Sequence, residues 1–433
     1  MNHLGGRAEP RAAKTRSLVA FGLRGSRRLG GFTISTALLA LGSLALMPAT
    51  IHAAGLETWS SIVLAQALAL IIVFVGGCGY GYNGPTVIAA LTPEDSVSYF
   101  FATQRTRFVV AVPCFAVAIG AMFIVPNPDP IAGLLGGAPL ALSAFSASFF
   151  FVGRAAPRWM LIADTGPRVT LMLAGAIILL LGGPLVVGLA LPVLGTVIAI
   201  AVSNVTIRRS AVGVTREIGP SVITGVRVEL RNQIHPLASS LLRGGAFALP
   251  VFVITAVAAE LVGVFGVFDR IRRQALAGFS PVTLTIQGWV PRRMANENTA
   301  RAAVAAMAVG IGAAFVSLLV FTILGRPIIR LLAADALKPT FTENLLCGAV
   351  IATMIMVQVN DLGCLVPLGE DKGVLVGNVV GIIFVVAALL AMLSLEKSVT
   401  YALGAIVIGN VVQIVTQIML IGYSLHSRKQ RIW

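Results

Sequence analysis

Charged residues are scarce in this sequence. Asp, Glu, Lys and Arg make up only 11% of the 433 residues, whereas 57% of the residues are hydrophobic. A water-soluble globular domain carries about 25% charged residues, because water must solvate its surface. The shortage of charge therefore excludes an ordinary set of soluble domains and indicates that lipid covers most of the surface.

Motifs for nucleotide, metal and covalent chemistry are also missing. The chain holds no Gly-Lys-Ser or Gly-Lys-Thr, so it has no P-loop with which to hydrolyse ATP. Its four histidines and four cysteines lack the paired spacing of a zinc site or a disulfide framework, and there is no Gly-x-Ser-x-Gly nucleophile elbow. We therefore expect no cofactor and no metal, and we expect that the protein is not an enzyme.

What is present is a series of long blocks without Asp, Glu, Lys or Arg, and about 20 such residues suffice to cross a bilayer. The blocks are residues 29–56, 58–93, 108–128, 130–153, 169–207, 302–325, 373–395 and 398–427. Gly182, Gly183 and Pro184 predict that block 169–207 forms two helices joined by a tight turn. Block 58–93 predicts one helix that ends in the Gly-rich run 76–85 and leads into an amphipathic or re-entrant piece. Interrupted spans near 232–256, 261–287 and 344–368 bring the predicted number of spans to twelve.

The basic residues follow the positive-inside rule when the amino terminus is placed in the cytoplasm. The predicted inward segments then hold 24 of the 32 Lys and Arg residues, and the outward loops hold four. We therefore predict an all-α polytopic membrane protein of about twelve transmembrane helices, with both termini in the cytoplasm. The net charge of +15 then faces anionic lipid, not nucleic acid.

A basic loop divides the predicted spans into two equal sets. Two six-helix bundles that rock around a central cavity are a common layout of transporters. The predicted segments are a basic cytoplasmic tail (1–28), an N-terminal six-helix bundle (29–207), a basic cytoplasmic linker (208–231), a C-terminal six-helix bundle (232–424) and a cytoplasmic tail (425–433). We expect the first part of the amino-terminal tail to be disordered, because it has no apolar periodicity.

Charged residues inside spans are the candidate site residues, because a charge in the bilayer is costly and is usually functional. They are Arg243 in the seventh span, Asp269, Arg270, Arg272 and Arg273 in the eighth, and Asp361 in the tenth. If the eighth span is helical, Asp269 can neutralise either Arg272 or Arg273, which follow it by three and four residues, while Arg270 points elsewhere. The excess of guanidinium groups, which bind phosphate in a bidentate manner, predicts a cavity for an anion.

These charges have simpler interpretations that the sequence leaves open. Arg243 can be the snorkelling end of a span that starts later. The arginines within 270–273 can mark a cytoplasmic loop between spans 244–268 and 274–291, although the basic residues then follow the positive-inside rule less well. Asp361 can bind a coupling ion or be satisfied by a neighbouring helix. The polar residues expected to hydrogen-bond between helices are Gln66 and Asn83.

Several short motifs carry a resemblance to a known family. Arg27-Arg28-Leu29-Gly30-Gly31 precedes the first span, and Gly55-Leu56-Glu57-Thr58-Trp59 precedes the second. Gly325-Arg326-Pro327 follows the ninth span, and the chain also contains Asp164-Thr165-Gly166-Pro167-Arg168. With these motifs nearly the whole chain resembles the MOP flippase superfamily, specifically the Wzx-type polysaccharide exporters of high-GC Gram-positive bacteria.

The resemblance implies a multi-pass transporter of the cytoplasmic membrane that flips a polyprenyl-pyrophosphate-linked oligosaccharide by alternating access, for polysaccharide biosynthesis. It implies a cationic lumen that holds the pyrophosphate and sugars while the lipid tail stays in the bilayer. The lumen candidates in this sequence are Arg243, Arg270, Arg272 and Arg273, with Arg28 and Arg154 near the inner mouth. The implied partners are the anionic lipid-linked oligosaccharide, membrane lipids and other membrane proteins of polysaccharide assembly.

Two other functions stay open. A cation-coupled antiporter of drugs or small solutes would use Asp269 or Asp361, but the buried arginines outnumber the buried carboxylates, which disfavours a cationic substrate. A membrane glycosyltransferase or polysaccharide polymerase would need a carboxylate on the outer face, where Glu57, Asp129 and Glu260 are available. Because the predicted outward loops are short, the flippase is the first hypothesis, the antiporter the second and the transferase the third.

Overall fold

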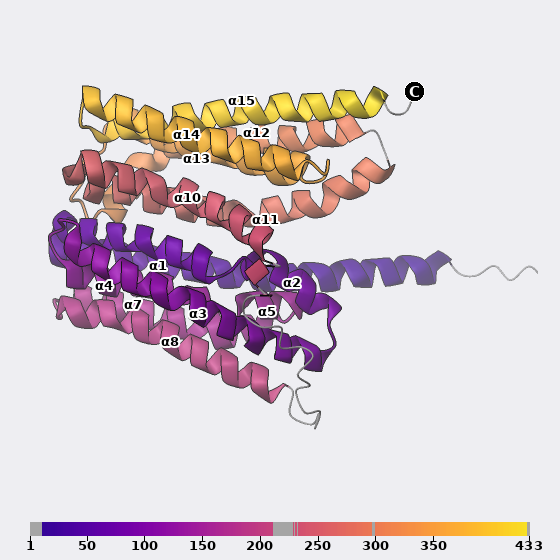
Figure 1. Cartoon of the computed structure of the whole chain (residues 1–433), viewed down its shortest axis with the longest axis horizontal. Coiled ribbons are helices and arrows are strands. Elements are labelled where there is room, and N and C mark those ends of the chain that lie inside the picture. The colour runs from indigo at the N-terminus through magenta and orange to yellow at the C-terminus, as the bar shows by residue number, and fades with distance from the viewer. Residues whose placement is uncertain (1–10, 211–227, 229, 232, 297–298, 431–433) are drawn as a thin grey trace, which may run out of the picture.

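The computed structural model describes residues 11–430, apart from 211–227, 229, 232 and 297–298. These described residues form helices joined by short turns, and none of them lies in a β-strand. Nine of the described helices are long and apolar enough to cross a membrane. The long helices run side by side along one direction (Figure 1), as membrane spans do because each helix satisfies its own backbone hydrogen bonds in lipid.

Helix α1 (Arg11–Gly76) supplies the first two crossings, because it bends at Gly55, where φ is 74° and ψ is 175°. It begins inside the segment predicted to be a disordered tail, since the Ala, Lys and Arg residues that follow Arg11 favour helix. It ends in the Gly-rich run, where Cys78 (φ 50°) and Gly79 (φ 73°) turn the chain into the short helix α2 (Tyr80–Ala90). The predicted end of this span is confirmed.

Two of the remaining crossings of the N-terminal half, α3 and α4, begin at side-chain caps that the sequence supplies. Thr92 accepts a hydrogen bond from the Asp95 backbone N–H before α3, and Asp129 accepts one from the Ala132 N–H (2.9 Å) before α4. The elements of this half are α3 (Pro93–Ile124), α4 (Pro130–Leu142), the 3₁₀ turn η1 (Ser143–Phe145), α5 (Ser148–Gly153), α6 (Pro157–Trp159), the π-helix η2 (Met160–Thr165), α7 (Gly166–Leu180) and α8 (Leu185–Arg209). The predicted tight turn between α7 and α8 is confirmed, and Gly182 adopts a φ of 79° in it.

The C-terminal half begins with α10 (Ile234–Val257), the 3₁₀ turn η4 (Ala259–Leu261) and α11 (Val262–Asn296). Helix α11 runs through residues 270–273 without a break, so the alternative with a cytoplasmic loop at these residues is wrong. The charges stay within the helix because the chain itself provides partners for them, as described below. The elements that follow are α12 (Thr299–Leu332), α13 (Phe341–Val359), the π-helix η5 (Asn360–Leu365), α14 (Asp371–Leu395) and α15 (Val399–Gln430).

The structure confirms the predicted all-helical membrane fold. Helix α1 covers two of the predicted spans, whereas the shorter apolar segment Pro130–Phe145 and the charged helix α11 lie at two further predicted spans but fall outside the nine apolar helices. With these included, the described helices correspond to the twelve predicted spans. The beginning of α1 and the end of α15 lie at the same end of the molecule (Figure 1), as an even number of crossings requires.

The two halves contact each other where α1 meets α10 and α11. Glycines permit the closest approaches there. A Cβ atom added at Gly244 would lie 2.0 Å from Phe74, and one added at Gly266 would lie 2.2 Å from Val63. The bounds given above for the two bundles stay predictions, and most of the linker 208–231 lies outside the described residues.

Candidate functional site

A charged cluster lies on α11, within the membrane-spanning part of the chain. The Asp269 carboxylate forms ion pairs with both Arg272 and Arg273, through Oδ1 and Oδ2 respectively. The spacing of three and four residues puts these side chains on one face of the helix. Asp269 is 3% exposed and Arg272 4%, so these charges are removed from solvent. One carboxylate thus forms ion pairs with two guanidinium groups, whereas the helical spacing predicted that it would neutralise only one.

Arg270 points away from this pair, as the helical spacing predicted, and reaches the other half of the protein. Its Nη1 donates to Gln66 Oε1 on α1 at 3.0 Å, and its Nη2 donates to Ser43 Oγ on α1. Gln274 Nε2 donates to the same Ser43 Oγ at 3.1 Å. Arg270 therefore lies in the interface between the halves, and Gln66 forms the interhelical hydrogen bonds expected of it.

Arg272 and Arg273 line a cavity of about 530 Å³ between α1, α10, α11, α13, α14 and α15. Most of its wall is apolar. The larger apolar residues of the wall include Leu70, Phe74, Phe247, Leu249, Leu276, Met354, Leu362, Ile382, Val385 and Ile406. The Arg272 Cζ lies 5.3 Å from the centre of the Phe247 ring, and this cation–π contact holds the guanidinium against α10. The cavity therefore combines positive charge with an extended apolar surface.

Another part of the cavity wall is polar and is built on Asp361 of the π-helix η5. The Asp361 Oδ2 accepts a hydrogen bond from Asn378 Nδ2 at 3.1 Å, and its Oδ1 accepts one from Gln417 Nε2 at 2.8 Å. Gln413 Nε2 donates to Asn378 Oδ1 at 3.0 Å, and Asn360 Nδ2 donates to Gln417 Oε1 at 3.2 Å. Helices α14 and α15 thus satisfy the carboxylate, which was one of the two interpretations that the sequence left open.

Glycines on α14 let this amide network form. Gly381 faces Gln413, whose Oε1 would lie 2.2 Å from a Cβ atom at that position. Gly377, one turn earlier, faces Gln417 in the same way, with Cγ at 3.1 Å. The two glutamines, themselves one turn apart on α15, can therefore lie flat against α14 and direct their ends toward Asp361 and Asn378.

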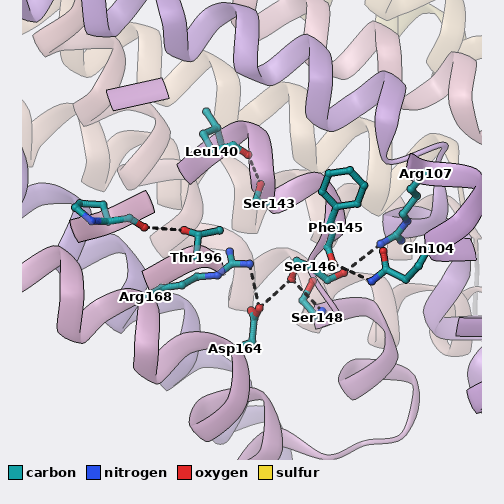
Figure 2. Close-up of polar contacts among 11 residues, drawn as sticks. Gln104, Arg107, Leu140, Ser143, Phe145, Ser146, Ser148, Asp164, Arg168 and Thr196 are labelled. Atoms are coloured by element: carbon teal, nitrogen blue, oxygen red, sulfur yellow. Dashed lines mark hydrogen bonds and ion pairs between the residues drawn. The ribbon is translucent and has the colours of Figure 1, made fainter. Parts of the chain in front are cut away.

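A second buried cluster of charge lies in the N-terminal half (Figure 2). Figure 2 shows Arg168 and Ser146 directed at the carboxylate of Asp164, with Arg168 Nη2 at 3.1 Å and Ser146 Oγ at 3.2 Å from Oδ1. Arg107 Nη1 donates to the Ser146 carbonyl at 3.1 Å, and its Cζ lies 4.4 Å from the centre of the Phe149 ring. Both guanidinium groups are buried. This cluster joins α3, the turn before α5, and the π-helix η2 with α7.

The sequence did not predict this N-terminal cluster, whose residues lie outside the wall of the cavity. In the sequence, Asp164 and Arg168 belong to one of the motifs that carry the family resemblance, and no contact was predicted for them. Their spacing of four residues is itself the signal of an ion pair on one helix face. Arg107 gave no such signal, because its partners lie about 40 residues away along the chain.

Four of the six predicted substrate-binding arginines are described in full. Arg272 and Arg273 line the cavity, and Arg270 lies beside it at α1. Arg154 is exposed, in the turn after α5, and not in the cavity wall. The side chains of Arg28 and Arg243 lie outside the described residues. The described cavity is therefore built around two guanidinium groups.

The carboxylates proposed for a transferase site lie apart from this cavity. Asp129 has a structural task, because it caps α4. Glu57 and Glu260 line an open cleft of about 530 Å³, together with residues of the α3–α4 turn. Both are exposed. Glu57 therefore lies in contact with solvent beside the bend in α1, and Glu260 lies in contact with solvent in the turn before α11.

Among the comparisons with known proteins, only those with solved structures gave matches. No known family profile matches the sequence, and no curated protein matches it. A multidrug resistance MATE family transporter of the MOP superfamily, in an inward-facing conformation, has 14% identity and a TM-score of 0.65 over 90% of this chain and 96% of its own. A MOP superfamily transporter from Pyrococcus furiosus, described by the reverse polarity of its binding pocket, has 15% identity and a TM-score of 0.55 over 93% and 96%. A eukaryotic MATE transporter has 12% identity and a TM-score of 0.52 over 95% and 99%. This multi-pass membrane protein therefore has the fold of the MATE transporters of the MOP superfamily.

Proposed function

We propose that the protein is a transporter of the cytoplasmic membrane that moves an anionic, lipid-linked oligosaccharide by alternating access. The observation that carries the proposal is the cavity in which Arg272 and Arg273 face an extended apolar wall. Guanidinium groups suit a pyrophosphate, and apolar residues suit the first part of a lipid chain. An amphiphile with an anionic head therefore fits this cavity better than a fully polar sugar phosphate does.

The balance of charge supports an anion over a cationic drug. In and beside the cavity, Arg270, Arg272 and Arg273 outnumber the carboxylates Asp269 and Asp361, and both carboxylates already have partners within the protein. The structural relatives include a transporter described by the reverse polarity of its binding pocket, so this fold accommodates pockets of different charge. The fold also supports alternating access, because two halves that meet along α1, α10 and α11 can separate.

The sidedness of lipid-linked oligosaccharide in proteoliposomes tests the proposal, with an impermeant lectin as the probe. We expect lectin-accessible lipid to rise with time only when the protein is present. Arg272→Gln should slow this rise about tenfold or more, since it removes a charge-assisted hydrogen bond to the head group. Asp269 keeps Arg273 as its partner in this variant. Arg330→Gln, at an exposed ion pair, is the matched control and should not slow it.

A cation-coupled antiporter is the second candidate, because Asp361 lines the same cavity. In that case Asp361→Asn would abolish drug or ion flux, while the lectin assay would give the same signal with and without the protein. The transferase is the third candidate, and it would require that Glu57→Gln or Glu260→Gln removes a product-forming activity. If lectin-accessible lipid does not depend on the protein, the flippase proposal is abandoned for whichever of these activities responds.

A further inference from the structure

Arg270 makes its described hydrogen bonds across the interface between the halves, unlike Arg272 and Arg273, which pair within α11. It donates to Gln66 Oε1 at 3.0 Å and to Ser43 Oγ, both on α1. The side chain of Gln66 is itself buried. A hydrogen bond from a charged donor to a buried neutral acceptor is among the stronger ones in a protein. These contacts therefore stabilise the arrangement in which α11 lies against α1.

The same arrangement brings the first turns of α11 into close packing with α1. A Cβ atom added at Gly263 would lie 2.5 Å from the Leu56 carbonyl oxygen, and one added at Gly266 would lie 2.2 Å from Val63. The zone of α11 that contacts α1 extends from Gly263 to Gln274, whose side chain donates a hydrogen bond to Ser43. At 1.5 Å per residue this zone is about 16 Å long.

Farther along, α11 faces its own half instead of α1. A Cβ atom at Gly363 in η5 would lie 2.7 Å from Ile286 of α11. The contacts that α11 makes with α1 thus lie toward the end where α11 begins. The positive-inside rule predicts that this end is the outer one.

We propose that Ser43, Gln66 and Arg270 form a latch that holds the outer side of the transport path closed. The proposal rests on the proposed function in one respect, because alternating access requires the halves to part at this side in each cycle. Parting moves α1 away from α11 and breaks both hydrogen bonds of Arg270. Asp269 cannot replace them without giving up Arg272 or Arg273, so the latch resists opening. Gln66 and Ser43 are therefore positioning residues that set the balance between the closed and open states.

Two substitutions at one position test the latch. Gln66→Leu removes the acceptor for Arg270, whereas Gln66→Glu keeps an oxygen there and adds a negative charge. Both variants lose the donor that Gln66 Nε2 offers to the Gly136 carbonyl at 3.3 Å, so the comparison isolates the contact with Arg270. We expect opposite effects: the Leu variant opens the outer side and the Glu variant closes it further.

The readout is the rate at which an impermeant maleimide labels a cysteine introduced at Val262, a buried residue at the beginning of α11. The full chain is used in proteoliposomes without substrate, after Cys78, Cys114, Cys347 and Cys364 are replaced by Ala. We expect Gln66→Leu and Ser43→Ala to raise the rate about tenfold and Gln66→Glu to lower it, in line with the loss or gain of a hydrogen bond to a charged group. Gln104→Leu, which removes an amide that donates to the Phe145 carbonyl within the N-terminal half, is the control and should leave the rate unchanged.

Equal labelling rates in the wild type, Gln66→Leu and Gln66→Glu, or an increase in both variants, would overturn the latch. If Gln66→Leu does not fold, an unchanged rate in Ser43→Ala overturns it equally. Because labelling is measured without a substrate, its outcome is separate from that of the lectin assay. If the labelling rates support the latch but the lectin assay shows no flipping of lipid, the proposed substrate is wrong and the latch still stands.

Discussion

Replacing Asp269 with Asn removes the one carboxylate that serves two buried arginines, with almost no change in size. Removing one partner of a buried ion pair costs about 3–5 kcal/mol, because the remaining charge has no compensation. Here Arg272 (4% exposed) and Arg273 (14% exposed) lose their partner together. The entropy of unfolding is about 2.1 cal/mol/K per residue, or roughly 0.9 kcal/mol/K for the whole chain, so the unfolding temperature should fall by roughly 3–6 °C.

The assay is thermal unfolding of the detergent-solubilised protein, followed by fluorescence-detected gel filtration. Asp335→Asn is the matched control, because this carboxylate is 74% exposed in its pair with Arg330 and surface pairs contribute little. Asn also tolerates the positive φ of 58° at this position. The double variant Asp269→Asn/Arg273→Gln should recover part of the lost stability. If the Asp269→Asn variant unfolds at the same temperature as the wild type, the two buried arginines do not depend on this carboxylate, and the prediction is wrong.

Two further predictions concern packing inside each half. Asn378→Leu removes a donor to Asp361 and should destabilise the protein by about 1–3 kcal/mol, which would be measured as a lower unfolding temperature. An unchanged unfolding temperature would mean that the carboxylate does not need Asn378 beside Gln417. Gly175→Ala would bring a Cβ atom to 2.4 Å from the backbone of α8 and should destabilise by about 1–3 kcal/mol. Gly120→Ala meets nothing within 4 Å and should be neutral or stabilising, so equal unfolding temperatures of the two Ala variants would contradict a close α7–α8 contact.

The number of spans and several of their ends could be predicted from the sequence, because lipid imposes simple rules. A span needs a long block without charge, and a turn between two spans needs residues such as Gly182 that end a helix. The shared face of Asp269, Arg272 and Arg273 was also predictable, since it depends only on helical spacing. These features are local, and each can be recognised within one or two turns of a helix.

The composition of the cavity wall could not be predicted, because it depends on how distant helices face each other. Gln413 and Gln417 show the spacing of one helix face, but nothing in the sequence indicates that this face meets Asp361, more than 50 residues earlier. In the same way, Arg270 was expected to point away from Asp269, but its partners Ser43 and Gln66 lie more than 200 residues away. Contacts of this kind follow from tertiary packing, which one sequence does not reveal.

The π-helices η2 and η5 each carry a buried carboxylate, Asp164 and Asp361, and each joins directly to an α-helix. A π-turn holds one residue more than an α-turn, and one residue corresponds to about 100° of rotation in an α-helix. Deleting a single residue other than Asp164 within η2 would thus turn the π-turn into an α-turn and leave its two ends in nearly the same relative rotation. Deleting one residue of α7 before Gly175 would instead rotate the two parts of that helix, so that Gly175 would turn away from Gly188 and a bulky neighbour would meet α8. A one-residue deletion should therefore be less damaging in the π-turn than in the α-helix that follows it, although neither interrupts the hydrophobic block.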